Sequence, residues 1–158
     1  MDKIKSCIGK IIYMAAMKEN IFKLSAFNSG PFNNVDCHSF SETLFSVNGF
    51  NKIHELYSEK LSSFSGDQAF ILRCMYVLSS YEATGDMAVV NLVFNSPLNV
   101  SSVSKYIHLN NFVSYYFIIS KSPWYSSSNI DIDLYYFEFN YSQIFTSEIS
   151  THFKKKKS

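Results

Sequence analysis

One short stretch of the sequence has side chains of the types that contact nucleic acids. Apolar residues at Val100, Val103 and Ile107 recur at helical spacing, which predicts a helix over residues 100–110 with this side turned inward. The other side of that helix carries small polar or basic residues, Ser101, Ser102, Ser104, Lys105 and His108. Hydroxyl groups can bond to base edges, and a lysine ammonium pairs with phosphate. The chemistry that this stretch favours is therefore recognition, not bond making.

The other reactive side chains do not form a catalytic pattern. The sequence has no G-x-S-x-G elbow, no P-loop and no glycine-rich dinucleotide turn. Asp131 and Asp133 alternate along a predicted strand, so both are explained as solvent-facing residues of one face. A nucleophile built on Cys37 or Cys74 stays open, since catalytic partners are adjacent only in space. We expect a protein that is not an enzyme and that carries no cofactor.

The cysteines and the hydropathy favour a cytoplasmic protein. Cys7, Cys37 and Cys74 form an odd set at wide spacing, which is typical of reduced thiols. Cys37 and His38 are adjacent, but no second ligand pair lies nearby, so we expect no metal site. No apolar run is long enough to span a bilayer, and no signal-peptide layout is present, so we expect no membrane association.

Length and composition predict one packed domain. The chain has 158 residues, of which 47% are hydrophobic and 17% aromatic, enough to bury a core. The domain is expected to span residues 1–153, followed by a basic tail at 154–158. The net charge of +1 is low for a dedicated nucleic-acid binder, so it favours no class of partner.

The N-terminal part, residues 1–61, is predicted to be helical. An amphipathic pattern over residues 2–24 indicates a first helix, and the turn-forming residues between 28 and 34 indicate a connection. Helical spacing returns over residues 41–61, as one long helix or two, and Gly49 is expected to break or bend it.

The remaining elements predict a mainly α fold with a small antiparallel β-hairpin wing (α+β). Ser65 and Gln68 form a capping-box pattern that begins a helix with an inward stripe of five residues, Ile71, Cys74, Met75, Leu78 and Tyr81. A short helix over 87–94, the helix 100–110 and a hairpin over 113–139 follow. This order predicts a winged helix-turn-helix over residues 65–139, with additional N-terminal helices and a C-terminal helix at 141–153.

The segment VSSVSKYIHLNNFV, residues 100–113, resembles the helix-turn-helix of the multiple-antibiotic-resistance regulator (MarR) family. The resemblance implies a homodimeric transcriptional regulator that binds double-stranded DNA, with residues 1–61 as the dimerisation region. It places helix 100–110 in the major groove and the 113–139 hairpin as the wing. Lys121 would then flank the recognition helix together with His108, and Trp124 and Tyr125 would lie in the wing. The sequence departs from the family at Asn111, where glycine is common, and its wing tip lacks the usual arginine.

A second interpretation needs no DNA. The same winged scaffold, with few basic residues and a tyrosine-rich hairpin, would also suit a protein-protein interaction module, an inhibitor or adaptor. The arrangement of charge separates the two hypotheses. DNA binding predicts that Lys105, Lys121, Arg73 and some N-terminal or tail lysines converge on one face around the recognition helix, whereas an interaction module predicts an exposed aromatic patch on that same face.

Overall fold

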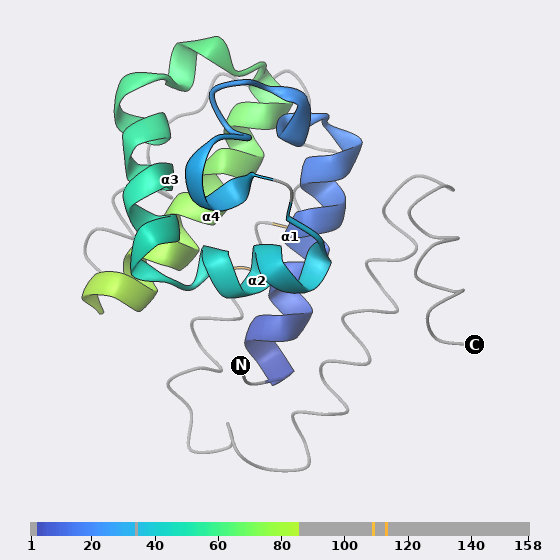
Figure 1. Cartoon of the computed structure of the whole chain (residues 1–158), viewed down its shortest axis with the longest axis vertical. Coiled ribbons are helices and arrows are strands. Elements are labelled where there is room, and N and C mark those ends of the chain that lie inside the picture. Colours follow the sequence, from blue (N-terminus) through green and yellow to red (C-terminus); the bar gives the residue numbers. More distant parts are fainter. Residues whose placement is uncertain (1–2, 34, 86–108, 110–112, 114–158) are drawn as a thin grey trace.

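The computed structural model describes residues 3–33, 35–85, 109 and 113, and this part of the chain is mainly helical (Figure 1). Its α-helices are α1 (Lys3–Lys18), α2 (Cys37–Leu44), α3 (Val47–Glu59) and α4 (Gly66–Thr84). Three 3₁₀ turns, Ile21–Lys23, Gly30–Phe32 and Leu61–Ser63, connect them. In the described residues there is no strand, and no helix is long and apolar enough to cross a membrane.

The first helix is shorter than the predicted span of residues 2–24. It ends at Lys18, and Asn20 adopts the left-handed conformation with φ 59° before the 3₁₀ turn Ile21–Lys23. Asparagine tolerates that conformation because its short polar side chain bonds locally. The apolar residues after position 18 suggested a longer helix. They belong instead to a 3₁₀ turn that places Ile21 in the core.

The turn-rich connection after this helix is packed by aromatic rings. Phe27 and Phe32 are fully buried, with ring centroids 4.9 Å apart, and Phe32 also contacts Phe40 of α2 at 5.8 Å. Tyr13 of α1 and Phe22 both lie 5.5 Å from the Phe40 ring. These contacts fix the loop between α1 and α2, so the segment is part of the core.

The pattern over residues 41–61 corresponds to two helices, of which α2 already begins at Cys37 and α3 ends at Glu59, and the break is not at Gly49. The chain leaves the helical conformation at Phe45, and Ser46 caps α3 by accepting a hydrogen bond from the Gly49 amide at 3.0 Å. Gly49 itself is a buried residue inside α3. Here glycine allows close approach of the chain: a side chain would collide with the Thr43 carbonyl group at the end of α2.

The capping box that begins α4 is confirmed. The Ser65 hydroxyl accepts from the Gln68 amide at 3.3 Å, and the Gln68 side chain accepts from the Ser65 amide at 3.0 Å. The helix ends at Gly85, which adopts φ 68°. The predicted stripe is buried except for Tyr81, which is half-buried, but burial extends to almost every position from Ala69 to Ser80.

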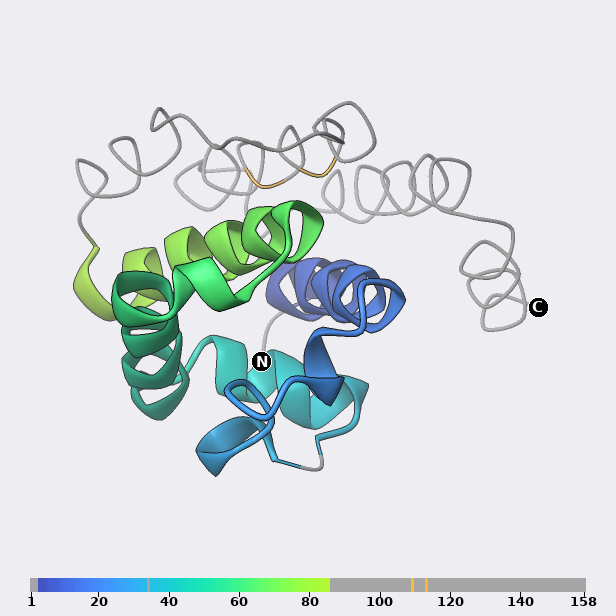
Figure 2. The ribbon, with the colours of Figure 1, turned by 90° about the horizontal axis from the view of Figure 1, so that it is seen from above.

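Helices α1 and α4 form the middle of the described structure. In Figure 2 they lie between α2 on one side and the two coloured segments at residues 109 and 113 on the other. Leu109 and Val113 are buried in the same core cluster as the side chains of α1 and α4. Both residues are helical, which agrees with the prediction at Leu109.

The predicted wing strand does not begin at Val113. This residue is helical and fully buried, and it follows the buried Leu109 by four positions in the sequence. Its β-branched side chain favoured a strand, but strand propensity depends on what the side chain packs against, and here it packs into a helical core. The rest of the predicted hairpin, residues 114–139, lies outside the described residues.

Candidate interaction surface

All of the predicted DNA-contacting residues lie outside the described part of the chain. They are Ser101, Ser102, Ser104, Lys105, His108, Lys121, Trp124 and Tyr125. The predicted short helix 87–94, the C-terminal helix 141–153 and the basic tail lie outside it as well. Leu109 is the one residue of the predicted recognition helix that the structure describes, and it is buried, as is Val113 three residues after the predicted end.

Arg73 does not lie on the protein surface, although the DNA-binding hypothesis requires it there. Arg73 is only 7% exposed and lies within the run of buried residues of α4. Its charge lowers the pKa of the Tyr57 hydroxyl of α3, against the larger effect of burial. A guanidinium group held in a helical core does not reach a phosphate. The predicted convergence of Arg73 with Lys105 and Lys121 on one face is therefore wrong for Arg73.

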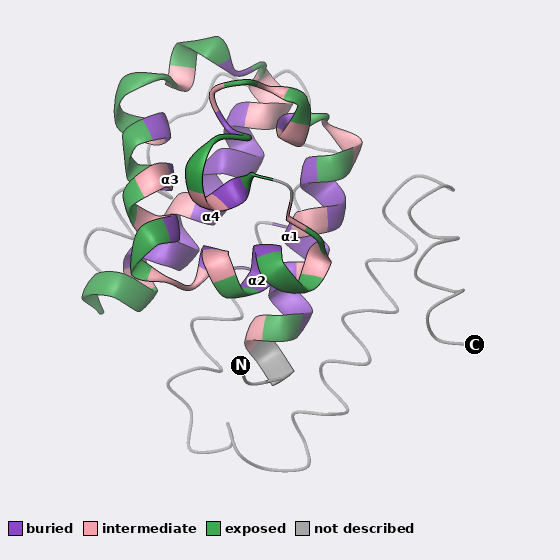
Figure 3. Cartoon of the chain, in the orientation of Figure 1, coloured by how far each residue is buried: buried purple, intermediate pink, exposed green. Residues whose placement is uncertain are grey.

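The described surface carries a cluster of aromatic side chains, which we call the aromatic row: Phe50, His54 and Tyr57 of α3 with Tyr76 of α4. Tyr57 and Tyr76 have ring centroids 4.6 Å apart, and Phe50 stacks on Tyr76 at 6.4 Å with an interplanar angle of 19°. His54 is exposed and the other three are half-buried. Figure 3 shows exposed, intermediate and buried residues along α3.

A hydrogen bond joins the two helices within the row. The hydroxyl of Tyr76 lies 3.1 Å from Nδ1 of His54. Burial raises the pKa of Tyr76, and it also raises the pKa of Tyr57, although the Arg73 charge acts in the opposite direction. Both phenol groups are therefore neutral at physiological pH. The row offers apolar ring area together with hydroxyl groups, the combination that is enriched in protein interfaces.

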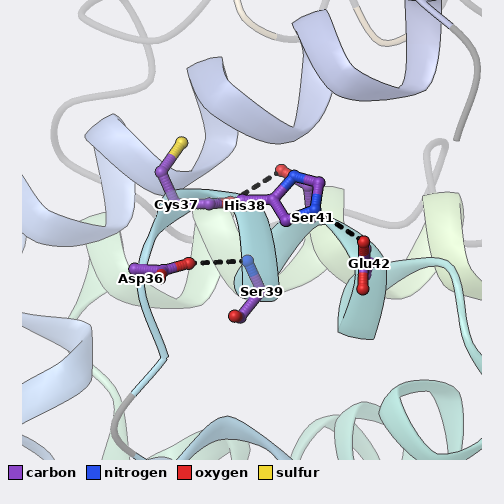
Figure 4. A network of polar contacts seen from close by, with 6 residues as sticks. All are labelled: Asp36, Cys37, His38, Ser39, Ser41 and Glu42. Atoms are coloured by element: carbon purple, nitrogen blue, oxygen red, sulfur yellow. Dashed lines mark hydrogen bonds and ion pairs between the residues drawn. The ribbon is translucent and has the colours of Figure 1, made fainter.

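A second cluster, made of polar residues, lies at the N-terminus of α2 and is shown in Figure 4. Asp36 caps the helix by accepting from the Ser39 amide at 2.8 Å, and this hydrogen bond lowers the pKa of its carboxyl group. His38 Nε2 lies 2.7 Å from the Glu42 carboxylate one turn later, with both side chains largely exposed. These contacts account for the group as a helix cap and a surface pair.

The thiols of the described residues differ in their burial. Burial raises the pKa of Cys74 to about 12, so this thiol stays protonated and unreactive. Cys7 is buried as well, and Cys37 is half-exposed at the start of α2. Within the described ranges, no three histidine, cysteine or acidic residues are grouped closely enough to hold a metal ion.

No family model, no curated protein and no solved structure matches this chain.

The aromatic row was not foreseen from the sequence, although a signal was present. Val47, Phe50, His54 and Tyr57 follow one another at alternating intervals of three and four residues, which places them on one side of a helix. The buried residues Gly49, Ile53 and Leu56 form the adjacent stripe. Helical spacing alone shows that both stripes exist, but the position of Tyr76 beside one of them depends on how α3 packs on α4.

Proposed function

We propose that this protein is a DNA-binding transcriptional regulator whose helix over residues 100–110 contacts the major groove. The observation that carries the proposal is Leu109, which is helical and only 1% exposed in the core. A recognition helix needs one side fixed on the core so that its other side can enter the groove. The polar residues that precede Leu109 in the sequence supply that other side.

The burial of Leu109 and Val113 narrows the choice of contacting residues. If the proposed helix is regular and continues through Val113, Ser102 lies on the buried side, because it precedes these residues by seven and eleven positions. Ser104 lies on the opposite side, five and nine positions before them. In this register Val100 and Ile107 lie on that outward side as well, which differs from the inward stripe expected from the sequence. Ser101 and His108 face outward with Ser104, and Lys105 lies at the edge, where its long side chain can extend to a phosphate.

Charge reversal on the proposed helix tests this function. We expect Lys105→Glu and Ser104→Glu each to weaken binding to double-stranded DNA by about tenfold or more, because each places a carboxylate beside the phosphates. The matched control is Lys60→Glu, an exposed lysine after α3 that the proposal leaves away from DNA. Fluorescence anisotropy with a labelled duplex at low salt measures the effect. Equal affinity of all three variants and the wild type would remove this helix from the interface.

The aromatic row favours a second candidate function, a protein-protein interaction module that does not bind DNA. A chain that only needed a stable fold would gain little from keeping His54 exposed beside the rings of Phe50 and Tyr76. Tyrosine rings of this kind contribute strongly to binding when a partner covers them.

Two histidine variants test the second candidate. His54→Asp places a charge in the centre of the aromatic row, and His38→Asp makes the same change on the exposed surface of α2. Under the interaction hypothesis, proteins captured by the wild type are also captured by His38→Asp but at least tenfold less by His54→Asp, measured by quantitative mass spectrometry with circular dichroism as a check of folding. The same proteins in equal amount on both variants would exclude the row.

A further inference from the structure

Helices α1 and α4 are buried around most of their circumference. In α1 the buried residues include neighbours in sequence, Ile11 with Ile12 and Ala15 with Ala16, and in α4 every residue from Ala69 to Met75 is buried. A helix that packs on one side only has a polar opposite side, whereas a helix that is apolar all round is covered on all sides. Both helices therefore need cover on two sides.

The described helices cover only one of these sides. Gly9 of α1 packs directly on Ser41 of α2, and Tyr76 of α4 packs on Tyr57 of α3. Figure 2 shows α2 on one side of the layer formed by α1 and α4, and the segments at residues 109 and 113 on the opposite side. Leu109 and Val113, at 1% and 0% exposure, belong to the same core cluster as this layer.

We infer that the side of α1 and α4 away from α2 is a docking surface for the segment of this same chain that carries Leu109 and Val113. The occupant is a part of this chain because two of its side chains already lie in that core, and the chain continues from residue 86 to residue 158 beyond α4. The N-terminal helices and the segment around residue 109 then fold as one cooperative unit. This inference is independent of DNA binding.

The buried thiol of Cys74 reports on this docking in the full-length protein. Cys74 is fully buried in α4, so alkylation by iodoacetamide requires opening of the core, whereas half-exposed Cys37 serves as the internal reference. We expect Leu109→Asn to accelerate labelling of Cys74 at least tenfold relative to Cys37, because the polar amide disfavours the docked state. Val47→Asn, at a residue that is 67% exposed on α3, is the matched control and leaves the ratio unchanged.

A milder substitution keeps the test decisive if Leu109→Asn unfolds the protein. Val113→Ala removes only part of a buried side chain, and we expect a several-fold increase of Cys74 labelling together with faster amide exchange throughout α1. Faster exchange in α1 is the mark of one cooperative unit, because the changed residue lies in a distant part of the sequence. Wild-type rates of Cys74 labelling and of α1 exchange in both variants would overturn the inference.

Discussion

Replacing Gly49 with alanine is expected to destabilise the protein by about 3 kcal/mol or more, toward the upper end of the overpacking range. A Cβ atom at this position would collide with the carbonyl oxygen of Thr43 and lie 2.8 Å from its carbonyl carbon. Both atoms belong to the backbone at the end of α2, so relief requires moving α2 relative to α3. Helix propensity alone predicts the opposite sign, a gain of up to about 1 kcal/mol for alanine over glycine.

Urea denaturation monitored by circular dichroism measures this effect, and Ser58→Ala is the matched control. Ser58 is exposed on the same helix, so its replacement should change the free energy of unfolding by no more than about 0.5 kcal/mol. A Gly49→Ala protein that is as stable as the wild type would mean that α2 and α3 do not meet in the tight corner described here.

Gly9→Ala is expected to destabilise the contact between α1 and α2 by about 1–3 kcal/mol. A Cβ atom on Gly9 would collide with the Ser41 hydroxyl and lie 2.6 Å from Ser41 Cβ and 3.2 Å from its Cα. The Ser41 hydroxyl donates to the Cys37 carbonyl oxygen at 3.0 Å, and rotating it away would not remove the clash with Cβ. The collision is with side-chain atoms, so the expected loss is smaller than at Gly49.

A compensating substitution separates this steric effect from a general loss of stability. Ser41→Gly removes both clashing side-chain atoms, so the double variant Gly9→Ala, Ser41→Gly should be more stable than the sum of the two single effects predicts. A coupling free energy of about 1 kcal/mol in a double-mutant cycle is the expected result. Simple additivity would show that the two residues do not touch.

The N-terminal helices were predicted from local signals. The ends of these helices were predicted wrongly where contacts with other parts of the fold determine them. Helical spacing and the Ser65–Gln68 capping box depend on neighbouring residues, and the capping box is confirmed in detail. The end of α1 depends on the left-handed Asn20, and the corner between α2 and α3 depends on contact of Gly49 with Thr43. These are properties of the packed structure.

Burial was predicted less well than secondary structure. The sequence indicated one inward stripe on α4, but the helix is buried almost all round because other parts of the chain cover it on two sides. For the same reason Arg73, which any charge count assigns to the surface, lies in the core. The helical conformation of Val113 also reflects its buried neighbours, which β propensity does not include.

The candidate surface could be predicted only in part. The polar side of helix 100–110 is predicted from sequence spacing alone. The burial of Leu109 and Val113 implies a different register, in which Ser102 faces the core. The aromatic row required knowledge that Tyr76 of α4 lies against Tyr57 of α3, two residues nineteen positions apart. Contacts between helices of this kind are not encoded in the periodicity of either helix.

Binding of the purified full-length protein to a pool of random double-stranded DNA, at about 50 and 200 mM salt, tests the proposed function most directly. We predict that binding falls steeply between the two salt concentrations, because phosphate contacts provide most of the affinity. We also predict that the selected duplexes share a sequence, because base contacts provide sequence specificity. Absence of binding at the lower salt concentration would contradict a DNA-binding regulator and leave the aromatic row as the principal candidate surface.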